Sequence, residues 1–264
     1  MEYKLRKPWQ VTRSVWYALF MREALARTTA DRFAWVWMLL EPIAMIVIMV
    51  LIRTVAFGKT QHIAGVEFVS WFIVGLFGFH LFRENMMRLI GAIDANKALF
   101  AYRQVKPIDP VLIRSFVESM LKTLIFLIFI FVGKLLDISL IPDQIITAFF
   151  YWISLWGLGL GLGLVLSVFS TLYSEIGRIT KILSFPLLLV SGVLFPLHYV
   201  PNELQSYLLL NPIAHGVELL RGSFFVNYQV IAGVSELYLI IWCLITILIG
   251  LALHIKFEDE LKAK

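Results

Sequence analysis

The sequence has few charged residues and almost no cysteine. Asp, Glu, Lys and Arg make up only 16% of the 264 residues, whereas hydrophobic residues make up 60% and the mean hydropathy is +0.84. A chain with so little charge does not cover its surface with polar groups, which excludes an ordinary water-soluble domain. Cys243 is the single cysteine, so an internal disulfide is excluded as well. These absences indicate a protein embedded in a membrane.

The sequence also lacks the motifs of an enzyme. Residues 57–60 read Phe-Gly-Lys-Thr, like the end of a phosphate-binding loop, but Arg53 stands where that loop needs its first glycine. Four alternate glycines in residues 157–163 superficially suggest a dinucleotide fingerprint, but no strand precedes them. The five histidines have no metal-ligand spacing, and no Ser-His-Asp arrangement is identifiable. We therefore predict no catalytic, cofactor or metal site.

Six long apolar stretches dominate what is present. A bilayer core about 30 Å thick needs about 20 helical residues per crossing. The stretches are apolar on every face, unlike the alternating strands of a membrane barrel, so helices are expected. The predicted spans are Val36–Phe57, Phe68–Ile90, Phe116–Leu136, Ile145–Phe169, Ile179–Phe195 and Leu237–His254. We predict an all-α integral membrane protein, a single domain of residues 1–264 with a six-span bundle over residues 36–254.

The distribution of Lys and Arg predicts the orientation, because these residues are retained on the cytoplasmic side of a membrane. Basic residues are dense before the first span and in every second loop after it, whereas the other loops carry only Lys59, Lys134 and Arg221. Both termini are therefore predicted to be cytoplasmic. The formal net charge of +5 follows from this arrangement and from attraction to anionic lipid, so a nucleic-acid partner is not expected.

Residues 9–30 have a character of their own. Val11, Val15 and Leu19 recur at helical spacing within a basic segment. We predict an amphipathic helix in the inner membrane interface, a position that tryptophans such as Trp9 favour. A simple cytoplasmic extension of the first span is the alternative.

Residues 196–225 predict two short helices at the outer face. Asn202 is expected to cap the first, and Asn211 with Pro212 to stop it and start the second, which Gly222 would end. The second helix is expected to place Ile213, Val217, Leu220 and Phe224 on one face and His215, Glu218 and Gly222 on the other. Neither helix is long enough to span a bilayer, so they predict an interfacial or re-entrant hairpin.

Ionisable residues at membrane depth often mark a transport path. Two sets are expected at similar depth near the cytoplasm, because the second and third spans are antiparallel. They are Arg83, Glu84 and Arg88 in the second span, and Arg114, Glu118 and Lys122 along one face of the third. The two interpretations are a structural ion-pair network and a cationic entrance for an anionic head group. His80 favours a packed or pore-facing group over a proton relay, since no carboxylate is expected at its depth.

The glycine run has two interpretations within the fourth span. Gly157 and Gly161, and likewise Gly159 and Gly163, are four residues apart, a spacing that lets helices approach closely. Close packing is favoured over a flexible gate for this segment.

Two segments resemble a known family. The run from Leu210-Asn211-Pro212-Ile213 to Glu218-Leu219-Leu220-Arg221 resembles the Asn-Pro signature of ABC-2-type permeases, and residues 37–43, with Leu40, Glu41 and Pro42, resemble the polysaccharide-export branch. The signature residues carried over are therefore Leu40, Glu41, Pro42, Asn211, Pro212, Glu218 and Arg221. The resemblance covers essentially the whole chain and is closest to permeases of capsular polysaccharide exporters.

The resemblance implies a transport subunit of the bacterial inner membrane. It implies a homodimer joined to two copies of a separate ATPase, which binds ATP and Mg, and a lipid-linked, often acidic polysaccharide as cargo. Periplasmic and outer-membrane export proteins are further partners that it allows. In this family the loop after the second span touches the ATPase. The corresponding residues here are Asp94, Phe100, Tyr102 and Arg103.

Aromatic residues supply candidates for the cargo path, because sugar rings stack on aromatic faces. The chain is 14% aromatic, although interfaces and helix packing use aromatics too. The predicted path residues are Trp71, Phe79, Arg83, Arg88, Tyr151, Trp152 and Trp156.

Other functions compete with this one. The Asn-Pro signature is shared with permeases for drugs and teichoic acid, so another cargo, O-antigen included, is an alternative. An ion-coupled transporter is disfavoured by the scarcity of buried carboxylates, and a membrane-embedded enzyme acting on lipid has no catalytic constellation.

Overall fold

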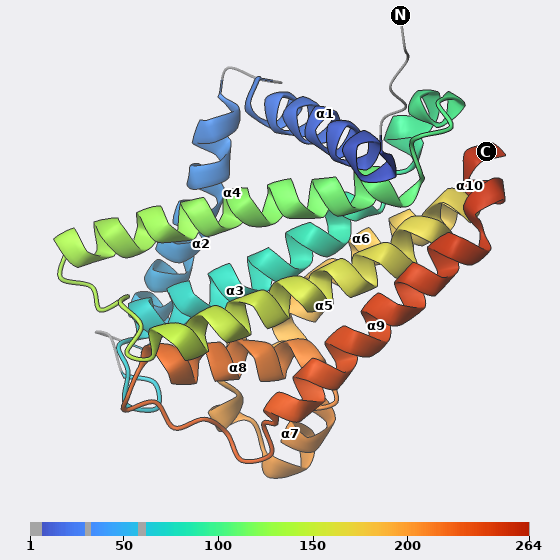
Figure 1. Ribbon diagram of the computed structural model, residues 1–264. Coiled ribbons are helices and arrows are strands. Elements are labelled where there is room, and N and C mark those ends of the chain that lie inside the picture. The colour runs from blue at the N-terminus through green and yellow to red at the C-terminus, as the bar shows by residue number, and fades with distance from the viewer. Residues whose placement is uncertain (1–6, 30–32, 58–61, 264) are drawn as a thin grey trace, which may run out of the picture.

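The computed structural model describes residues 7–29, 33–57 and 62–263, and helices form most of this part of the chain. Within it no strand occurs, apart from an isolated bridge between Ile63 and Val66. The α-helices are α1 (Pro8–Thr29), α2 (Ala34–Phe57), α3 (Phe68–Leu89), α4 (Ile108–Leu135), α5 (Ile145–Leu172), α6 (Ser174–Val190), α7 (Asn202–Leu208), α8 (Pro212–Phe224), α9 (Glu236–Lys256) and α10 (Glu258–Ala263), with 3-10 segments η1 (Asp94–Ala101) and η2 (Leu197–Tyr199) (Figure 1). The prediction of an all-helical chain is confirmed.

α5 lies at the centre of the bundle. It packs most extensively against α9 and α3, and α8 lies against both α3 and α5 (Figure 1). The main core contains fully buried rings such as Phe72, Phe77 and Phe82 from α3. The fold therefore buries α3 almost completely, although its C-terminal turns carry charged residues.

Close packing at the glycine run explains how α5 contacts two helices at once. A Cβ added to Gly159 would lie 2.6 Å from the Phe82 carbonyl oxygen, and one added to Gly163 would lie 2.7 Å from a methyl of Leu89. A Cβ on Gly161 would collide with Thr246 on α9. Gly159 and Gly163 thus admit α3 and Gly161 admits α9, which confirms the packing interpretation.

Among the described residues, four helices are long and apolar enough to cross a membrane. They are α2, over Val36–Val55, and the full lengths of α4, α5 and α9. The predicted second span is α3, whose C-terminal turns bear Arg83, Glu84 and Arg88. The predicted fifth span is α6, which has only 17 residues. The lengths and compositions of the described helices therefore support four of the six predicted spans.

Three helix boundaries differ clearly from the predicted spans, and one of them is the start of α6 at Ser174 rather than Ile179. α4 begins at Ile108 rather than Phe116. Its first turns contain polar residues such as Asp109 and Ser115, which are buried against other parts of the protein, so the helix extends beyond the apolar stretch. α6 ends at Val190 rather than Phe195, and the chain turns at Gly192, whose φ is +67°. Predictions that involve residues 1–6, 30–32, 58–61 and 264, including several basic residues used for the orientation, lie outside the described residues.

α1 and α2 lie at the periphery of the bundle. α1 lies across α4, against which Leu19 is buried with Ile113 and Val117 (Figure 1). α2 diverges from the bundle, and only 6% of its apolar stretch is buried inside the protein. Its exposed apolar side chains include Ile48, Leu51 and Val55. Such a surface is stable in lipid or against a further helix.

The segment after α6 contains the two predicted short helices, with three corrections. Asn202 is the first residue of α7 rather than its cap, and Pro201 precedes it without a side-chain cap. α8 continues past Gly222 to Phe224, because the chain leaves the helix in extended conformation at Phe225 and needs no left-handed cap. The predicted polar face of α8 belongs to the core, since His215 and Glu218 are buried.

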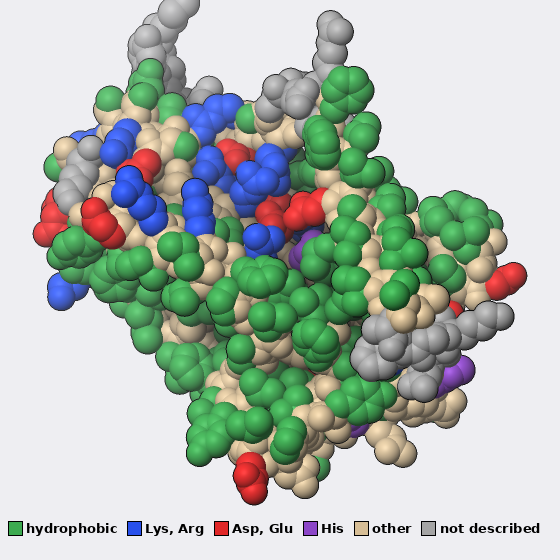
Figure 2. All heavy atoms as spheres, turned by 180° about the vertical axis from the view of Figure 1, so that it is seen from behind, with side chains coloured by type: hydrophobic (Ala, Val, Ile, Leu, Met, Phe, Trp, Pro, Cys, Tyr) green, Lys and Arg blue, Asp and Glu red, His purple; other side chains and the backbone are tan. Residues whose placement is uncertain are grey.

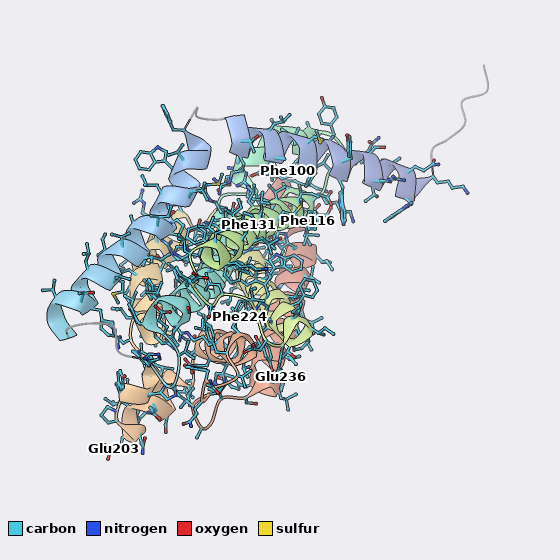
Figure 3. All side chains as sticks on the ribbon, turned by 90° about the vertical axis from the view of Figure 1, so that its left-hand side faces the viewer. Phe100, Phe116, Phe131, Glu203, Phe224 and Glu236 are labelled. Carbon is cyan, nitrogen blue, oxygen red and sulfur yellow. The ribbon has the colours of Figure 1, made fainter. Side chains whose placement is uncertain are left out.

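The bundle has two distinct ends. Figure 3 shows Phe100 of η1 close to α1 at one end, and Glu203 of α7 and Glu236 of α9 toward the other. Phe224 of α8 lies in the interior in the same view. We call these the α1 end and the α7 end. α10 lies at the α1 end as well (Figure 1).

Candidate functional site

A buried arginine organises the first of two polar clusters. Arg221 on α8 is fully buried, and its guanidinium carbon lies 3.5 Å from the centre of the Trp71 ring on α3. Its Nη1 donates to Oε1 of Glu218 at 2.9 Å, and its Nε donates to the Trp71 carbonyl oxygen at 3.2 Å. Ring, carboxylate and carbonyl together compensate for the desolvation of the cation. This arrangement fixes α8 to α3.

Tyr228 completes what we call the α8 cluster, formed by Trp71, Glu218, Arg221 and Tyr228. The Tyr228 hydroxyl donates to Oε2 of Glu218 at 2.8 Å and accepts from Nε1 of Trp71 at 3.2 Å. Burial, and then the charge of Glu218, raise the pKa of Tyr228 well above its usual value. The phenol therefore keeps its proton and serves as a donor to Glu218. Sequence analysis missed Tyr228, which lies in a loop and belongs to no recognisable motif.

The Asn-Pro signature binds the turn that follows α6. The side chain of Asn211 caps α8 by accepting from the Ile213 amide at 3.0 Å, as predicted, and its Nδ2 donates to Oγ of Ser191 at 3.0 Å. Arg221 donates to the carbonyl oxygens of Gly192, at 2.9 Å, and Val193, at 3.4 Å. The signature residues at the start of α8 and near its end thus hold the same three-residue turn.

The approach of Arg221 to α3 depends on a missing side chain. A Cβ added to Gly75 would overlap the Arg221 guanidinium. Gly75 lies one turn after Trp71 on the same helix. Glycine at this position therefore leaves the space that the cation occupies.

The second signature segment lies apart from the α8 cluster. Leu40 and Glu41 are exposed on α2, whereas Pro42 is buried within the same helix. A proline inside a helix removes one backbone hydrogen bond and favours a kink. The role implied for these residues stays a prediction.

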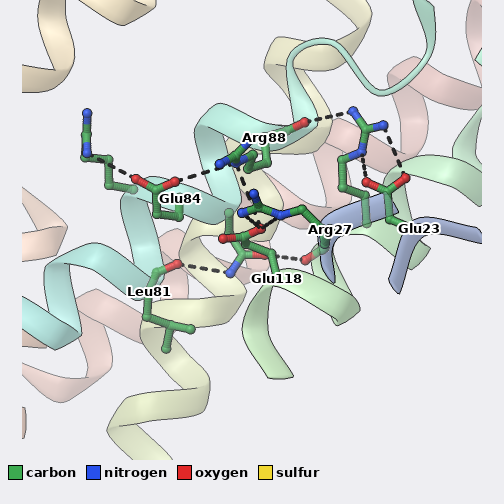
Figure 4. Close-up of polar contacts among 10 residues, drawn as sticks. Glu23, Arg27, Leu81, Glu84, Arg88 and Glu118 are labelled. Carbon is green, nitrogen blue, oxygen red and sulfur yellow. Dashed lines mark hydrogen bonds and ion pairs between the residues drawn. The ribbon is translucent and has the colours of Figure 1, made fainter. Parts of the chain in front are cut away.

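The second polar cluster joins three helices at the α1 end (Figure 4). Arg27 of α1 pairs with Glu118 of α4 at 2.6 Å, and Arg88 of α3 lies 3.9 Å from the same carboxylate. Arg88 also pairs with Glu84 at 3.7 Å. A separate bidentate pair joins Arg114 of α4 to Glu23 of α1, with the shorter distance 2.7 Å. We call Glu23, Arg27, Glu84, Arg88, Arg114 and Glu118 the charged network.

The sequence predicted only part of this network. It placed Glu84 and Glu118 beside basic neighbours, and both carboxylates do pair with arginines in the structure. It missed the contribution of α1, because nothing in an amphipathic helix reveals which charges cross to α4. Figure 2 shows that Lys, Arg, Asp and Glu side chains gather around a hollow on the back of the molecule. Part of the network therefore faces outward.

His80 lies deeper on α3 and is buried. The charged groups that interact electrostatically with His80 are Lys122 of α4, Glu84 and Arg83. The expectation that no carboxylate lies near its depth is wrong, because Glu84 follows one helical turn later and α3 remains helical through both. The packed interpretation agrees with the burial of His80, and nothing further assigns it a proton-carrying role.

The predicted ATPase-contact loop forms η1. Tyr102 is 66% exposed and Arg103 is exposed, whereas Phe100 is buried against neighbouring helices. Asp94 at its start pairs with Lys97 at 3.1 Å. Arg22 of α1 donates to the side chain of Asn96, so η1 is tied directly to α1.

Most of the aromatic residues predicted to line a path are buried and contact other residues of the protein. Trp152 stacks on Phe126 and donates to Thr123 at 2.9 Å, and the Tyr151 hydroxyl donates to Glu236 at 3.1 Å. The buried members of the set are Trp71, Phe79, Tyr151 and Trp152, whereas Trp156 and Arg83 are half-buried and the side chain of Arg88 is 46% exposed. In this conformation the four buried rings do not form an open surface.

The family model of the ABC-2 type transporter matches residues 14–225. This chain belongs to the ABC-2 type transporter family. The match includes both signature segments, the α8 cluster apart from Tyr228, and the whole charged network. The family's Asn-Pro segment is therefore the part that binds the turn after α6.

Characterised relatives extend the similarity over nearly the full length. The polysialic acid transport protein KpsM of Escherichia coli is 33% identical over 262 residues, covering 97% of this chain and 98% of KpsM. The capsule polysaccharide export inner-membrane proteins CtrC of Neisseria meningitidis and BexB of Haemophilus influenzae are 27% and 26% identical. Each of these alignments covers 91% of this chain and 90% of the relative.

Proposed function

We propose that this chain is the membrane permease subunit of an ATP-driven exporter that moves lipid-linked, acidic capsular polysaccharide across the bacterial inner membrane. The observation that carries the proposal is the full-length similarity to KpsM, CtrC and BexB, which are named for polysialic acid transport or capsule polysaccharide export. The family assignment supports transport rather than catalysis by this chain. Hydrolysis of ATP, with its Mg, belongs to a partner ATPase.

The proposed assembly contains two copies of this chain and two copies of the ATPase. The exposed apolar side of α2, with Ile48, Leu51 and Val55, is a surface that a second copy can cover. Tyr102 and Arg103, which directly follow η1, are exposed and accessible to the ATPase. The bond from Arg22 to Asn96 then carries a displacement of η1 into α1.

The proposed membrane arrangement has six spans: α2, α3, α4, α5, α6 and α9. α3 has 22 residues, about 33 Å of helix, and its charges lie at one end where they reach the membrane surface. α6 is shorter and continues into the turn held by the α8 cluster. In this arrangement both termini are cytoplasmic and α1 lies in the inner membrane interface. α7 and α8 form the outer hairpin, and α8, which is buried, is its re-entrant part.

The charged network is the proposed entrance for the anionic end of the cargo. Basic side chains in and around it, including Arg83 and Lys122, outnumber the acidic ones. Its partial exposure, 46% for the Arg88 side chain, leaves room for a phosphate or carboxylate to compete with Glu84. Arg83 donates to Glu84 at 3.1 Å and is 30% exposed, so it is a second candidate contact.

Removal of the chain from its host tests the proposal directly. Polysaccharide is measured outside and inside cells that lack this protein, and we expect loss at the surface with accumulation inside. Arg83→Gln and Arg88→Gln variants are then compared with the unaltered chain at equal protein level in the membrane. Normal surface polysaccharide in the deletion strain would contradict the cargo, and loss of a different exported compound would reassign it. Unchanged export by both variants would remove the entrance role alone.

A further inference from the structure

An apolar groove runs between α1, α4 and α5 at the α1 end. Its volume is about 580 Å³. The residues that line it include Trp16, Phe20, Leu112, Phe116, Trp156 and Leu160. Neither signature segment nor the charged network contributes to it, so it is separate from the sites described above.

The walls of the groove present hydrocarbon although they contain indole rings. Nε1 of Trp16 donates to Oδ1 of Asp109 at 2.9 Å, and Nε1 of Trp156 donates to Oγ of Ser115 at 3.0 Å. Trp9 is the third indole ring of the groove. Because the polar atoms of Trp16 and Trp156 are already bonded within the protein, this wall of the groove favours an acyl chain over a polar ligand.

A polar recess adjoins the groove on α1. Gln10, Arg13, Ser14 and Tyr17 line this recess, and Arg13 and Tyr17 line the groove as well. No hydrogen bond or ion pair joins Arg13 to another described residue. A guanidinium without a counter-charge among the described residues, at the junction of an apolar groove and a polar recess, matches an amphiphile with one anionic head.

We propose that this site binds one anionic glycerophospholipid, with an acyl chain in the groove and the head-group phosphate on Arg13. The inference rests on the proposed placement of α1 at the inner membrane surface and not on the cargo. A bound lipid of this kind would fill the space between α1 and the bundle, where Leu19 is the buried contact of α1. The lipid thereby stabilises the helix that carries Glu23 and Arg27.

The test uses the full chain in vesicles that contain phosphatidylcholine or phosphatidylglycerol with brominated acyl chains, which quench tryptophans in contact with them. We expect phosphatidylglycerol to bind in the groove about fivefold more tightly than phosphatidylcholine. This is the preference that one basic residue near an anionic head group confers. Arg13→Ala removes this preference, whereas Arg13→Lys keeps most of it. Lys7→Ala is the matched control, because it removes the same charge just before α1 without changing a groove residue.

A groove-filling variant separates this site from general lipid contact. Leu112→Phe narrows the groove without adding a tryptophan, and it is expected to weaken binding of both brominated lipids while Arg13 is unchanged. Equal binding of the two lipids by the unaltered chain would overturn the proposal and indicate ordinary surrounding lipid. Loss of preference in Lys7→Ala to the same extent as in Arg13→Ala would also overturn it, since the effect would then come from overall charge. Transport measurements play no part, so failure here leaves the proposed cargo standing.

Discussion

The α8 cluster and the charged network use the same chemistry in opposite surroundings. In the α8 cluster both Glu218 and Arg221 are fully buried, and each polar atom of the pair has a partner within the protein. In the charged network the Arg27 and Arg88 side chains are 21% and 46% exposed, and one oxygen of Glu118 has no partner among the described residues. A sealed cluster is costly to break, whereas an open network can exchange partners at little cost. The first therefore suits a fixed joint and the second a part that moves or binds.

Removal of one charge from the α8 cluster is expected to have the largest effect. Arg221→Met or Glu218→Gln alone should lower the free energy of unfolding by about 3–5 kcal/mol, because the remaining partner stays buried without its counterpart. The double variant should lose less than the sum of the two. Thermal unfolding of the purified chain in detergent measures these differences.

An exposed pair in the same chain is the control for that experiment. Glu258 pairs with Lys262 at 2.6 Å with both side chains about a third exposed. Glu258→Gln is expected to change the free energy of unfolding by less than about 1 kcal/mol. Equal effects of Glu258→Gln and Glu218→Gln would remove the distinction between sealed and open pairs.

Gly75→Ala tests the space beside Arg221. The added methyl overlaps the guanidinium, and we expect a loss of about 1–3 kcal/mol in the free energy of unfolding. Gly91→Ala is the control, because nothing lies within 4 Å of a Cβ there and a change within about 0.5 kcal/mol is expected. The two variants are compared by the same thermal measurement. A neutral Gly75→Ala would show that Arg221 has room to shift.

The cap of α8 should contribute less. Asn211→Ala removes the bond to the Ile213 amide and the one to Ser191, and a loss of about 1–2 kcal/mol is expected. Asn202→Ala, which removes no cap from α7, should be close to neutral. Similar melting temperatures for the two variants would contradict the assigned cap.

The charged network should show the smallest effect on stability and a separate effect on transport. Arg27→Gln is expected to lower the free energy of unfolding by about 1 kcal/mol, since Arg27 is partly exposed and Arg88 remains 3.9 Å from the buried Glu118 carboxylate. Export should nevertheless fall, because α1 loses one of its ion pairs with α4 while its bond to η1 through Arg22 remains. Export is measured at matched membrane level. A parallel loss of stability and export would assign the network a structural role only.

The long helices could be predicted because apolar runs of spanning length specify them directly. α2, α5 and α9 each agree with the predicted span to within two or three residues at either end. Asn211 was recognisable as a cap because the residue before Pro212 satisfies a local rule. Local rules failed at Gly222, where glycine serves close contact with Val230 rather than helix termination.

Contacts between distant segments could not be predicted. The sequence placed Glu218 on a polar face, yet burial of α8 by α3 and α5 made that face part of the core. Tyr228 and Gly192 join Arg221 through loops whose paths no periodicity reveals. The same applies to Arg27, because a basic residue on an amphipathic helix gives no indication that it pairs with Glu118.

Reconstitution of the chain in vesicles with its ATPase is the most direct test of the central claim, that this permease moves polysaccharide only with work from a partner. We predict that lipid-linked polysaccharide crosses the membrane when both proteins and ATP are present, and that omission of either protein or of ATP stops it. Movement driven by a proton or sodium gradient with this chain alone would contradict the account.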